Sequence, residues 1–168
     1  YFQGMDRHYL RTLLNNPIIE FMPGTIILSK GRVNEEIYLV ITGTVEKIRS
    51  EDDVYNVISA GGLIGEYTGI HGLPSLSTYR TVNFVRALRI TTRAYTELIK
   101  KNNLWEKIDQ RAKFRNSLEQ TWLFGETISP PVLNKIADAM LLQEFGTGTA
   151  LNDLPADAIF IVESGKVE

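Results

Sequence analysis

The sequence has 168 residues, of which 43% are hydrophobic and 23% are charged, and its formal net charge is -2. This length suits one domain, or one domain and part of another, with a substantial core. The small negative charge gives no overall attraction to nucleic acid or to an anionic membrane, so no nucleic-acid partner is expected. The absence of cysteine excludes disulfides, thiolate nucleophiles and zinc-thiolate sites, and it is compatible with a reducing, cytoplasmic location.

The first four residues, YFQG at 1–4, are typical of the remnant of a protease-cleavable purification tag and are not expected to belong to the fold. The chain from Met5 onward is therefore expected to be a fragment of a larger protein. No apolar run approaches the ~20 residues needed to span a bilayer. If the parent protein is membrane-bound, its spans are expected outside this fragment.

The first half of the chain predicts a short helix followed by β structure. Apolar residues recur on one side of residues 6–14, and Asn15-Asn16-Pro17 ends that helix. The following residues, up to Ile90, form short β-rich runs separated by Pro-Gly, Lys-Gly, Thr-Gly and Gly-Gly turns. These runs are residues 17–22, 25–29, 36–42, 44–50, 54–59, 77–83 and 84–90. Their number and spacing predict an antiparallel barrel or jelly roll.

After Thr91 the apolar pattern becomes helical, with a break at Asn102-Asn103 between the first two helices. A third helix is predicted to begin at Ser129-Pro130, because serine caps a first turn and proline fits inside it. The inner faces of the three helices are predicted to carry, in turn, Ala94, Leu98 and Ile99; Leu104, Trp105, Ile108 and Ala112; and Leu133, Ile136, Ala137 and Met140.

The end of the chain repeats its beginning. The segment EFMPGT at 20–25 returns as EFGTGT at 144–149, and EEIYLVITGTVE at 35–46 returns as DAIFIVESGKVE at 157–168. Both the glycines and the apolar phase match in the same order. This agreement favours a duplication over chance similarity between two short β segments.

The repetition gives a domain plan. A first domain is expected at residues 5–101, a helical linker at 102–128, and a second, partial β repeat at 129–168. Half a barrel leaves strand edges unpaired. The second repeat is therefore expected to be completed outside this chain, to dock on the first domain, or to form a reduced unit.

Ordered motifs resemble the cyclic nucleotide-binding domain family. They are F-x-P-G-x-x-I-x-x-x-G at 21–31, IYLVITGTVE at 37–46, GGLIGE at 61–66, and a segment of the P-x-x-x-T-V type at 74–79 that ends in tyrosine. The resemblance covers residues 6–116. It implies a mainly β fold with flanking helices: an eight-stranded antiparallel jelly roll with a short helix inside a phosphate-binding cassette. The cassette corresponds to residues 65–78 of this sequence. It also implies that helices behind the barrel move when a ligand binds.

In this family, backbone amides and a helix N-terminus face the cyclic phosphate, the acid of a Gly-Glu pair accepts a ribose hydroxyl, and an arginine neutralises the phosphate. The pair is present, but Ser75 stands at the arginine position and Leu76 replaces the small or hydroxyl residue beside it. The resemblance implies cAMP or cGMP as candidate ligand. The candidate ligand-binding residues are Gly65, Glu66, Tyr67, Thr68, Ser75, Ser77, Thr78 and Arg80.

The missing arginine leaves three interpretations open. In the first, Arg80 reaches the phosphate from the following strand, or the loop is longer than this alignment of the motif assumes. In the second, cyclic nucleotide binds through amides and the hydroxyls of Ser75, Ser77 and Thr78, with an affinity roughly ten- to hundredfold lower. In the third, the cassette holds another ligand, or only its own side chains such as Tyr67 or Tyr79. Glu66 also fits a structural role, because an acid in the first turn suits the helix dipole.

No other group of residues predicts chemistry. His8 and His71 are the only histidines in the sequence, too few for the inward-facing ligand set of a metal-dependent jelly roll, so neither a metal nor a cofactor is expected. No Ser/His/Asp arrangement has the context of a nucleophile elbow. The chain is therefore not expected to be an enzyme.

The segments after the barrel resemble the cytoplasmic tails of sodium/proton exchangers of the plant salt-tolerance type, and the sperm-type exchangers also carry such a barrel. LWEKIDQ at 104–110, LFGETISPPVLNKIADAM at 123–140 and GKV at 165–167 carry this resemblance. It implies a cytoplasmic regulatory module, for ligand sensing or for interaction, within a larger signalling or ion-transport protein.

Cyclic nucleotide binding by this module is expected to be weak or lost. Its expected partner is the rest of the parent protein, a membrane transporter or channel, and a homodimer is a further expectation. Two alternatives stay open: a structural or dimerisation domain that binds no small molecule, and a true cAMP or cGMP sensor.

Overall fold

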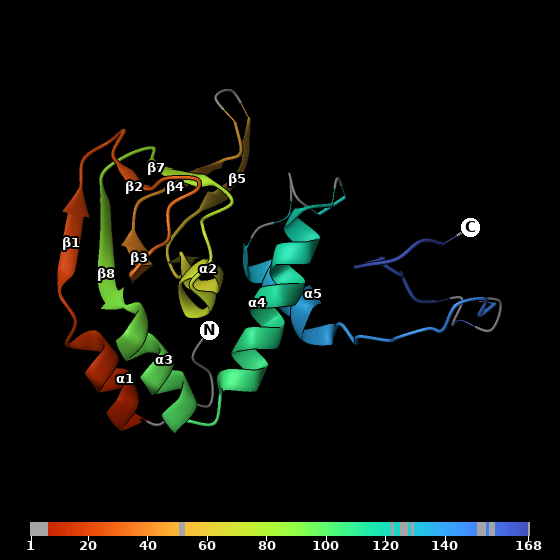
Figure 1. Cartoon of the computed structure of the whole chain (residues 1–168). Helices are drawn as coiled ribbons and strands as arrows, with labels where there is room; N and C mark the ends of the chain where they lie inside the picture. The colour runs from red at the N-terminus through yellow and green to blue at the C-terminus, as the bar shows by residue number, and fades with distance from the viewer. Residues whose placement is uncertain are drawn as a thin grey trace.

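In the described part of the chain, eight strands form two four-stranded antiparallel sheets that pack face to face, with helices against one side (Figure 1). This computed structural model describes residues 7–50, 53–121, 123–124, 128, 130–150, 154 and 157–167. Its elements are α1 (Arg7–Leu14), β1 (Ile18–Phe21), β2 (Ile26–Leu28), β3 (Glu36–Thr42), β4 (Val45–Ile48), β5 (Val54–Ile58), β6 (Leu63–Ile64), α2 (Glu66–His71), β7 (Thr78–Thr81), β8 (Val85–Thr91), α3 (Thr92–Lys101), α4 (Trp105–Glu119) and α5 (Pro130–Ala139).

The strand order confirms the predicted jelly roll. One sheet has the order β1-β8-β3-β6 and the other β2-β7-β4-β5, so neighbours in space come from distant parts of the sequence. Apolar side chains of both sheets meet between them in one cluster. Its buried members are Leu28, Val40, Val45, Ile58, Ile64, Val85 and Ala87.

The outer face of the β1-β8-β3-β6 sheet packs against α1, α3 and α4. Alternation along β3 makes this possible, because Ile37 and Leu39 face the helices while Tyr38 and Val40 face the second sheet. The helix side of this core contains Tyr95, which is 0% exposed. The central strands β3 and β8 therefore carry buried apolar residues on both faces, which fixes the helices against the barrel.

The three predicted helices after Thr91 are present as α3, α4 and α5. The predicted inner faces are correct except at Ala94, which is exposed, while the neighbouring Tyr95 is fully buried. Leu118 of α4 and Leu133 of α5, both 0% exposed, form the centre of a separate cluster between these two helices. The long helix α4 therefore lies between the barrel and α5 (Figure 1).

The chain after α5 contains no strand within residues 140–150, 154 and 157–167. In Figure 1 this segment extends away from α5 and then returns toward the helices, where Ile161 packs against the cluster between α4 and α5. The second, partial β repeat predicted for residues 129–168 begins with the expected helix but forms no sheet among the described residues. The duplication stays a prediction about the sequence.

Tyr38 gives the barrel a measurable alkaline sensitivity. Burial, and then the hydrogen bond that its hydroxyl donates to Glu36, raise the pKa of Tyr38 from 10.0 to about 12. The folded state therefore favours the neutral phenol, so this stabilisation is complete below pH 10 and is lost between pH 10 and about 12. Urea unfolding across this range should show a shallower loss of stability for Tyr38→Phe. Parallel curves would contradict this.

Candidate functional site

A cavity of about 400 Å³ lies between the barrel, the cassette and the inner side of α4. Strands β4, β5, β6 and β7 line it on the barrel side, α2 and the following loop line it on the cassette side, and α4 and α5 contribute the remaining wall. Its volume is in the range of small-molecule sites. The barrel and the helices thus share one potential ligand site.

The cassette helix begins where Asn34 fixes the backbone. Gly65 has φ +75°, and a Cβ there would lie 2.5 Å from the Asn34 side-chain nitrogen. That nitrogen donates to the carbonyl oxygens of Gly65 and Glu36, at 2.8 Å each, and the Asn34 oxygen accepts from the Thr68 hydroxyl at 2.7 Å. Glycine is therefore required at position 65 both by its backbone conformation and by this close approach.

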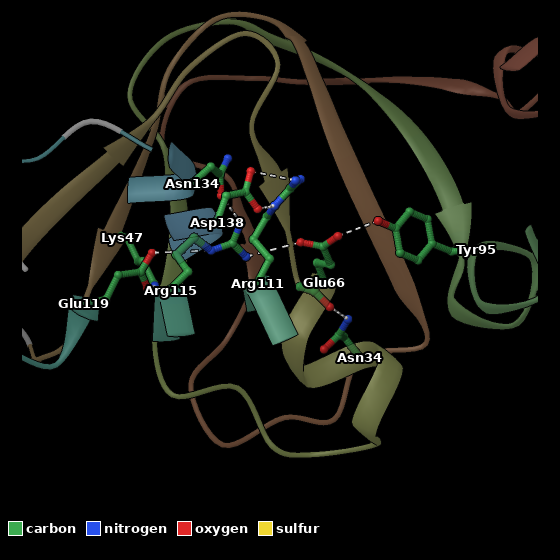
Figure 2. Close-up of polar contacts among 10 residues, drawn as sticks. Asn34, Lys47, Glu66, Tyr95, Arg111, Arg115, Glu119, Asn134 and Asp138 are labelled. Atoms are coloured by element: carbon green, nitrogen blue, oxygen red, sulfur yellow. Dashed lines mark hydrogen bonds and ion pairs between the residues drawn. The ribbon is translucent and has the colours of Figure 1, made fainter. Parts of the chain in front are cut away.

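Glu66 is bonded by side chains from two helices behind the barrel. Its carboxylate is 0% exposed and accepts a hydrogen bond from the hydroxyl of Tyr95 on α3. Its second oxygen lies 3.3 Å from Nη2 of Arg115 on α4 (Figure 2). The acid that the family resemblance assigns to a ribose hydroxyl therefore connects the cassette to α3 and α4.

Positive charge is present in the cavity, although the cassette itself supplies none. The cavity-lining residues include the cations Lys30, Lys47, Arg49 and Arg115, and two carboxylates, Glu66 and Glu119. Lys47 of β4 pairs with Glu119 of α4 (Figure 2), and their side chains are 10% and 13% exposed. Subtracting two carboxylates from four cations leaves two excess positive charges on this wall, whereas the whole chain carries -2.

Of the eight predicted ligand-binding residues, five line the cavity: Gly65, Glu66, Tyr67, Thr68 and Ser77. The other three, Ser75, Thr78 and Arg80, are not among its lining residues. Ser75 is buried, and its hydroxyl donates to the Ser77 carbonyl oxygen at 2.7 Å. The Thr78 hydroxyl accepts from the backbone amide of Lys30 at 3.1 Å. Both hydroxyls therefore form hydrogen bonds with backbone groups of neighbouring residues rather than facing the cavity.

Arg80 does not reach the cavity from its strand. It pairs with Glu46, directly opposite on β4, and its side chain is 44% exposed. Successive residues of a strand point to opposite faces, and the preceding residue, Tyr79, lines the cavity. The interpretation in which Arg80 replaces the missing arginine is therefore not supported by this geometry.

Helix α4 links the cavity to α5. The Arg111 guanidinium binds the Asp138 carboxylate at 2.5 Å and 2.8 Å, and Arg115 Nη1 lies 3.3 Å from the side-chain oxygen of Asn134 (Figure 2). The cassette touches α4 at a second point, where His71 Nε2 lies 2.7 Å from an oxygen of Asp109. A displacement of α4 would therefore change contacts both to α5 and to the cassette helix.

Two negative findings apply to the described residues. They contain no cluster of three or more histidine, aspartate or glutamate side chains placed to hold a metal ion. Among the described helices, none combines the length and apolar character that crossing a bilayer requires. The His8 side chain lies outside the described part of the structure.

The family model of the cyclic nucleotide-binding domain matches residues 18–102. Among curated proteins, the chain is similar to potassium channel KAT1 of Oryza sativa subsp. japonica, with 27% identity over 126 residues that cover 70% of this chain and 18% of the channel. Further curated matches are potassium channels of Oryza sativa and Arabidopsis thaliana. The chain spans less than a fifth of these relatives. Because these relatives are potassium channels, a sodium/proton exchanger as host, which was expected from the segment order, is not supported.

Solved structures show the same fold. The C-linker/CNBHD of zELK channels, crystallised in the presence of cAMP, aligns with a TM-score of 0.56 and 19% identity over 67% of this chain and 59% of that one. The regulatory subunit of a cAMP-independent protein kinase A from Trypanosoma brucei aligns with a TM-score of 0.56 and 18% identity, over 65% and 42%. At these identities the likeness establishes the fold, and the ligand has to be argued from the site.

Proposed function

Because the chain belongs to the cyclic nucleotide-binding domain family, we propose that it is a non-catalytic, cytoplasmic regulatory module of a larger ion-transport protein. The potassium channels among its relatives support a channel as the host. In this proposal a small ligand in the cavity changes the position of α4. The movement then passes through α5 to the rest of the host protein.

One observation carries the proposal. The cavity wall is shared by the barrel and by α4, and Glu66 of the cassette contacts Arg115 of α4 across it. A ligand that enters the cavity therefore touches both parts at once. Such a ligand shifts α4 only as far as it prefers one helix position over the other.

Cyclic nucleotide binding at this site is proposed to be weak. The position of the phosphate arginine is Ser75, which lies outside the cavity lining, and Glu66 is already engaged by Tyr95 and Arg115. Losing one hydrogen bond to a charged group weakens binding roughly ten- to hundredfold. The cavity lining includes apolar side chains at Ile58, Leu63 and Leu76, so an organic ligand still finds apolar contact.

Calorimetric titration with cAMP and cGMP, up to millimolar ligand, tests the proposal. Leu76 lines the cavity and is 51% exposed, whereas Leu73 in the same loop is 43% exposed and is not among the lining residues. Leu76→Glu places a negative charge near a ligand phosphate and should weaken saturable binding by about tenfold or more. Leu73→Glu adds the same charge and should leave binding unchanged. Equal weakening by both variants would locate binding elsewhere.

A structural or interaction domain that binds no small molecule is the second candidate. The contacts of Glu66 with Tyr95 and Arg115 favour it, because protein side chains already occupy the acid of the cassette. Absence of saturable heat with both nucleotides, up to millimolar ligand, would support this candidate. The homodimer expected from the sequence remains a prediction, which sedimentation analysis of the purified chain would test.

A further inference from the structure

The carboxylate of Glu119 lies next to two of the cations that line the cavity. One of its oxygens pairs with Lys47 of β4, and the other lies 3.9 Å from Nε of Arg115 (Figure 2). All three side chains line the cavity and are between 10% and 13% exposed. The last residue of α4 thus supplies an anion to the wall of a cavity in which cations exceed carboxylates.

The remaining cations gather on the same barrel wall. Lys30 Nζ donates to the backbone oxygen of Arg49 at 3.0 Å, which brings the loop after β2 to the end of β4. Lys47 Nζ lies 5.8 Å from the centre of the Tyr79 ring, so an aromatic face borders this cation. Positive charge in this cavity is therefore supplied by β4 and by the loop after β2, whereas the cassette has Ser75 at the position where an arginine was expected.

We propose that the cavity binds a small phosphate-bearing ligand whose phosphate takes the place of the Glu119 carboxylate at Lys47. This inference rests on the proposed function, in which a small ligand occupies the cavity. A phosphate offers more charge and more acceptor oxygens than a carboxylate, so it competes well for Lys47 with support from Arg49 and Arg115. The exchange also explains how a cassette without arginine remains compatible with an anionic ligand.

The exchange has a mechanical consequence. Glu119 is the last residue of α4, and its contact with Lys47 joins that end of the helix to β4. When phosphate occupies Lys47, this end of α4 separates from the barrel. Helix α5 follows, because Arg111 and Arg115 connect it to α4 through Asp138 and Asn134. Ligand binding is thereby converted into movement of the helices.

Titration with inorganic phosphate, followed by phosphorus NMR line width, tests the exchange. Glu119→Gln removes the competing charge and keeps the side-chain shape, so phosphate affinity should rise roughly ten- to hundredfold over the unmodified chain. Lys47→Met should abolish saturable binding, and Lys47→Arg should retain it. Glu46→Gln is the matched control, since Glu46 pairs with Arg80 outside the cavity lining; it should leave phosphate affinity unchanged.

The helix movement can be measured with spin labels, because the sequence contains no cysteine. Cysteines introduced at the exposed positions Val57 on β5 and Lys113 on α4 would carry one label each. Glu119→Gln, or phosphate added to the unmodified chain, should lengthen the distance between the labels. Glu46→Gln should leave it unchanged.

Two results would overturn the inference: a phosphate affinity that Glu119→Gln does not increase, or binding that survives Lys47→Met. If cAMP or cGMP nevertheless binds in a manner that depends on Leu76 and is insensitive to Lys47 and Glu119, the inference fails while the proposed function stands. If neither phosphate nor nucleotide binds to any of the variants, both fail. Tighter binding together with a longer label distance in Glu119→Gln supports the exchange.

Discussion

Replacing Arg115 with methionine is expected to destabilise the fold by about 3–5 kcal/mol, because it removes one partner of a buried ion pair. The Glu66 carboxylate is 0% exposed and the Arg115 side chain is 13% exposed, so water does not replace the guanidinium as a partner of this carboxylate in the folded chain. Tyr95 still donates to Glu66, but its neutral hydroxyl compensates a buried charge only in part. Urea unfolding at neutral pH measures the loss.

A double-mutant cycle separates this charge effect from lost packing. Glu66→Gln together with Arg115→Met should be more stable than Arg115→Met alone, since no charge is then left at the buried position. Arg80→Met is the matched control: it breaks the pair with Glu46 at a site where Arg80 is 44% exposed, and it should change stability by only about 0–1 kcal/mol. Equal losses of unfolding free energy for Arg80→Met and Arg115→Met would show that burial of the Glu66–Arg115 pair does not increase its contribution to stability.

The barrel could be predicted from the sequence because its signals are local. Runs such as residues 36–42 alternate between two apolar faces and are bounded by glycine turns, so each strand is recognisable without its partners. The order of the strands in the two sheets has no such local signal. The family resemblance implied an eight-stranded jelly roll, and the order of its strands is given by the structure alone.

The candidate site was predictable on one wall only. Gly65 and Glu66 belong to a contiguous motif, and both line the cavity. Lys47 and Glu119 are 72 residues apart in sequence, and each reads as an ordinary polar residue on a strand or a helix. Nothing in either segment signals that α4 brings Glu119 to β4. Only the packing of the helix against the barrel shows that these charges share a cavity.

The C-terminal segment shows the limit of pattern matching for strands. Residues 157–167 repeat the apolar phase of β3, yet they form no strand in the described chain. In the barrel, β3 pairs with β6 on one side and β8 on the other. No sheet edge pairs with the described part of the repeated segment. Strand formation depends on such non-local partners, whereas the helix α5 forms from hydrogen bonds within its own segment.

Replacing Leu118 with alanine is expected to destabilise the contact between α4 and α5 by about 2–5 kcal/mol. Leu118 and Leu133 are both 0% exposed and form the centre of the cluster between these helices, so the substitution leaves a cavity that the neighbouring side chains fill only in part. This cluster is separate from the one between the two sheets. The loss should therefore be concentrated in α5 and the adjoining part of α4.

Amide hydrogen exchange locates the effect. In Leu118→Ala, the amides of α5 should lose protection, while those of β3 and β8 keep it, because the barrel core does not include Leu118. Val132→Ala is the control on α5, since Val132 is 44% exposed and its truncation should change protection little. Equal loss of protection in β3 and α5 would mean that barrel and helices unfold as one unit. In that case α4 could not move α5 independently of the barrel, and the proposed transmission from the cavity through α4 would be wrong.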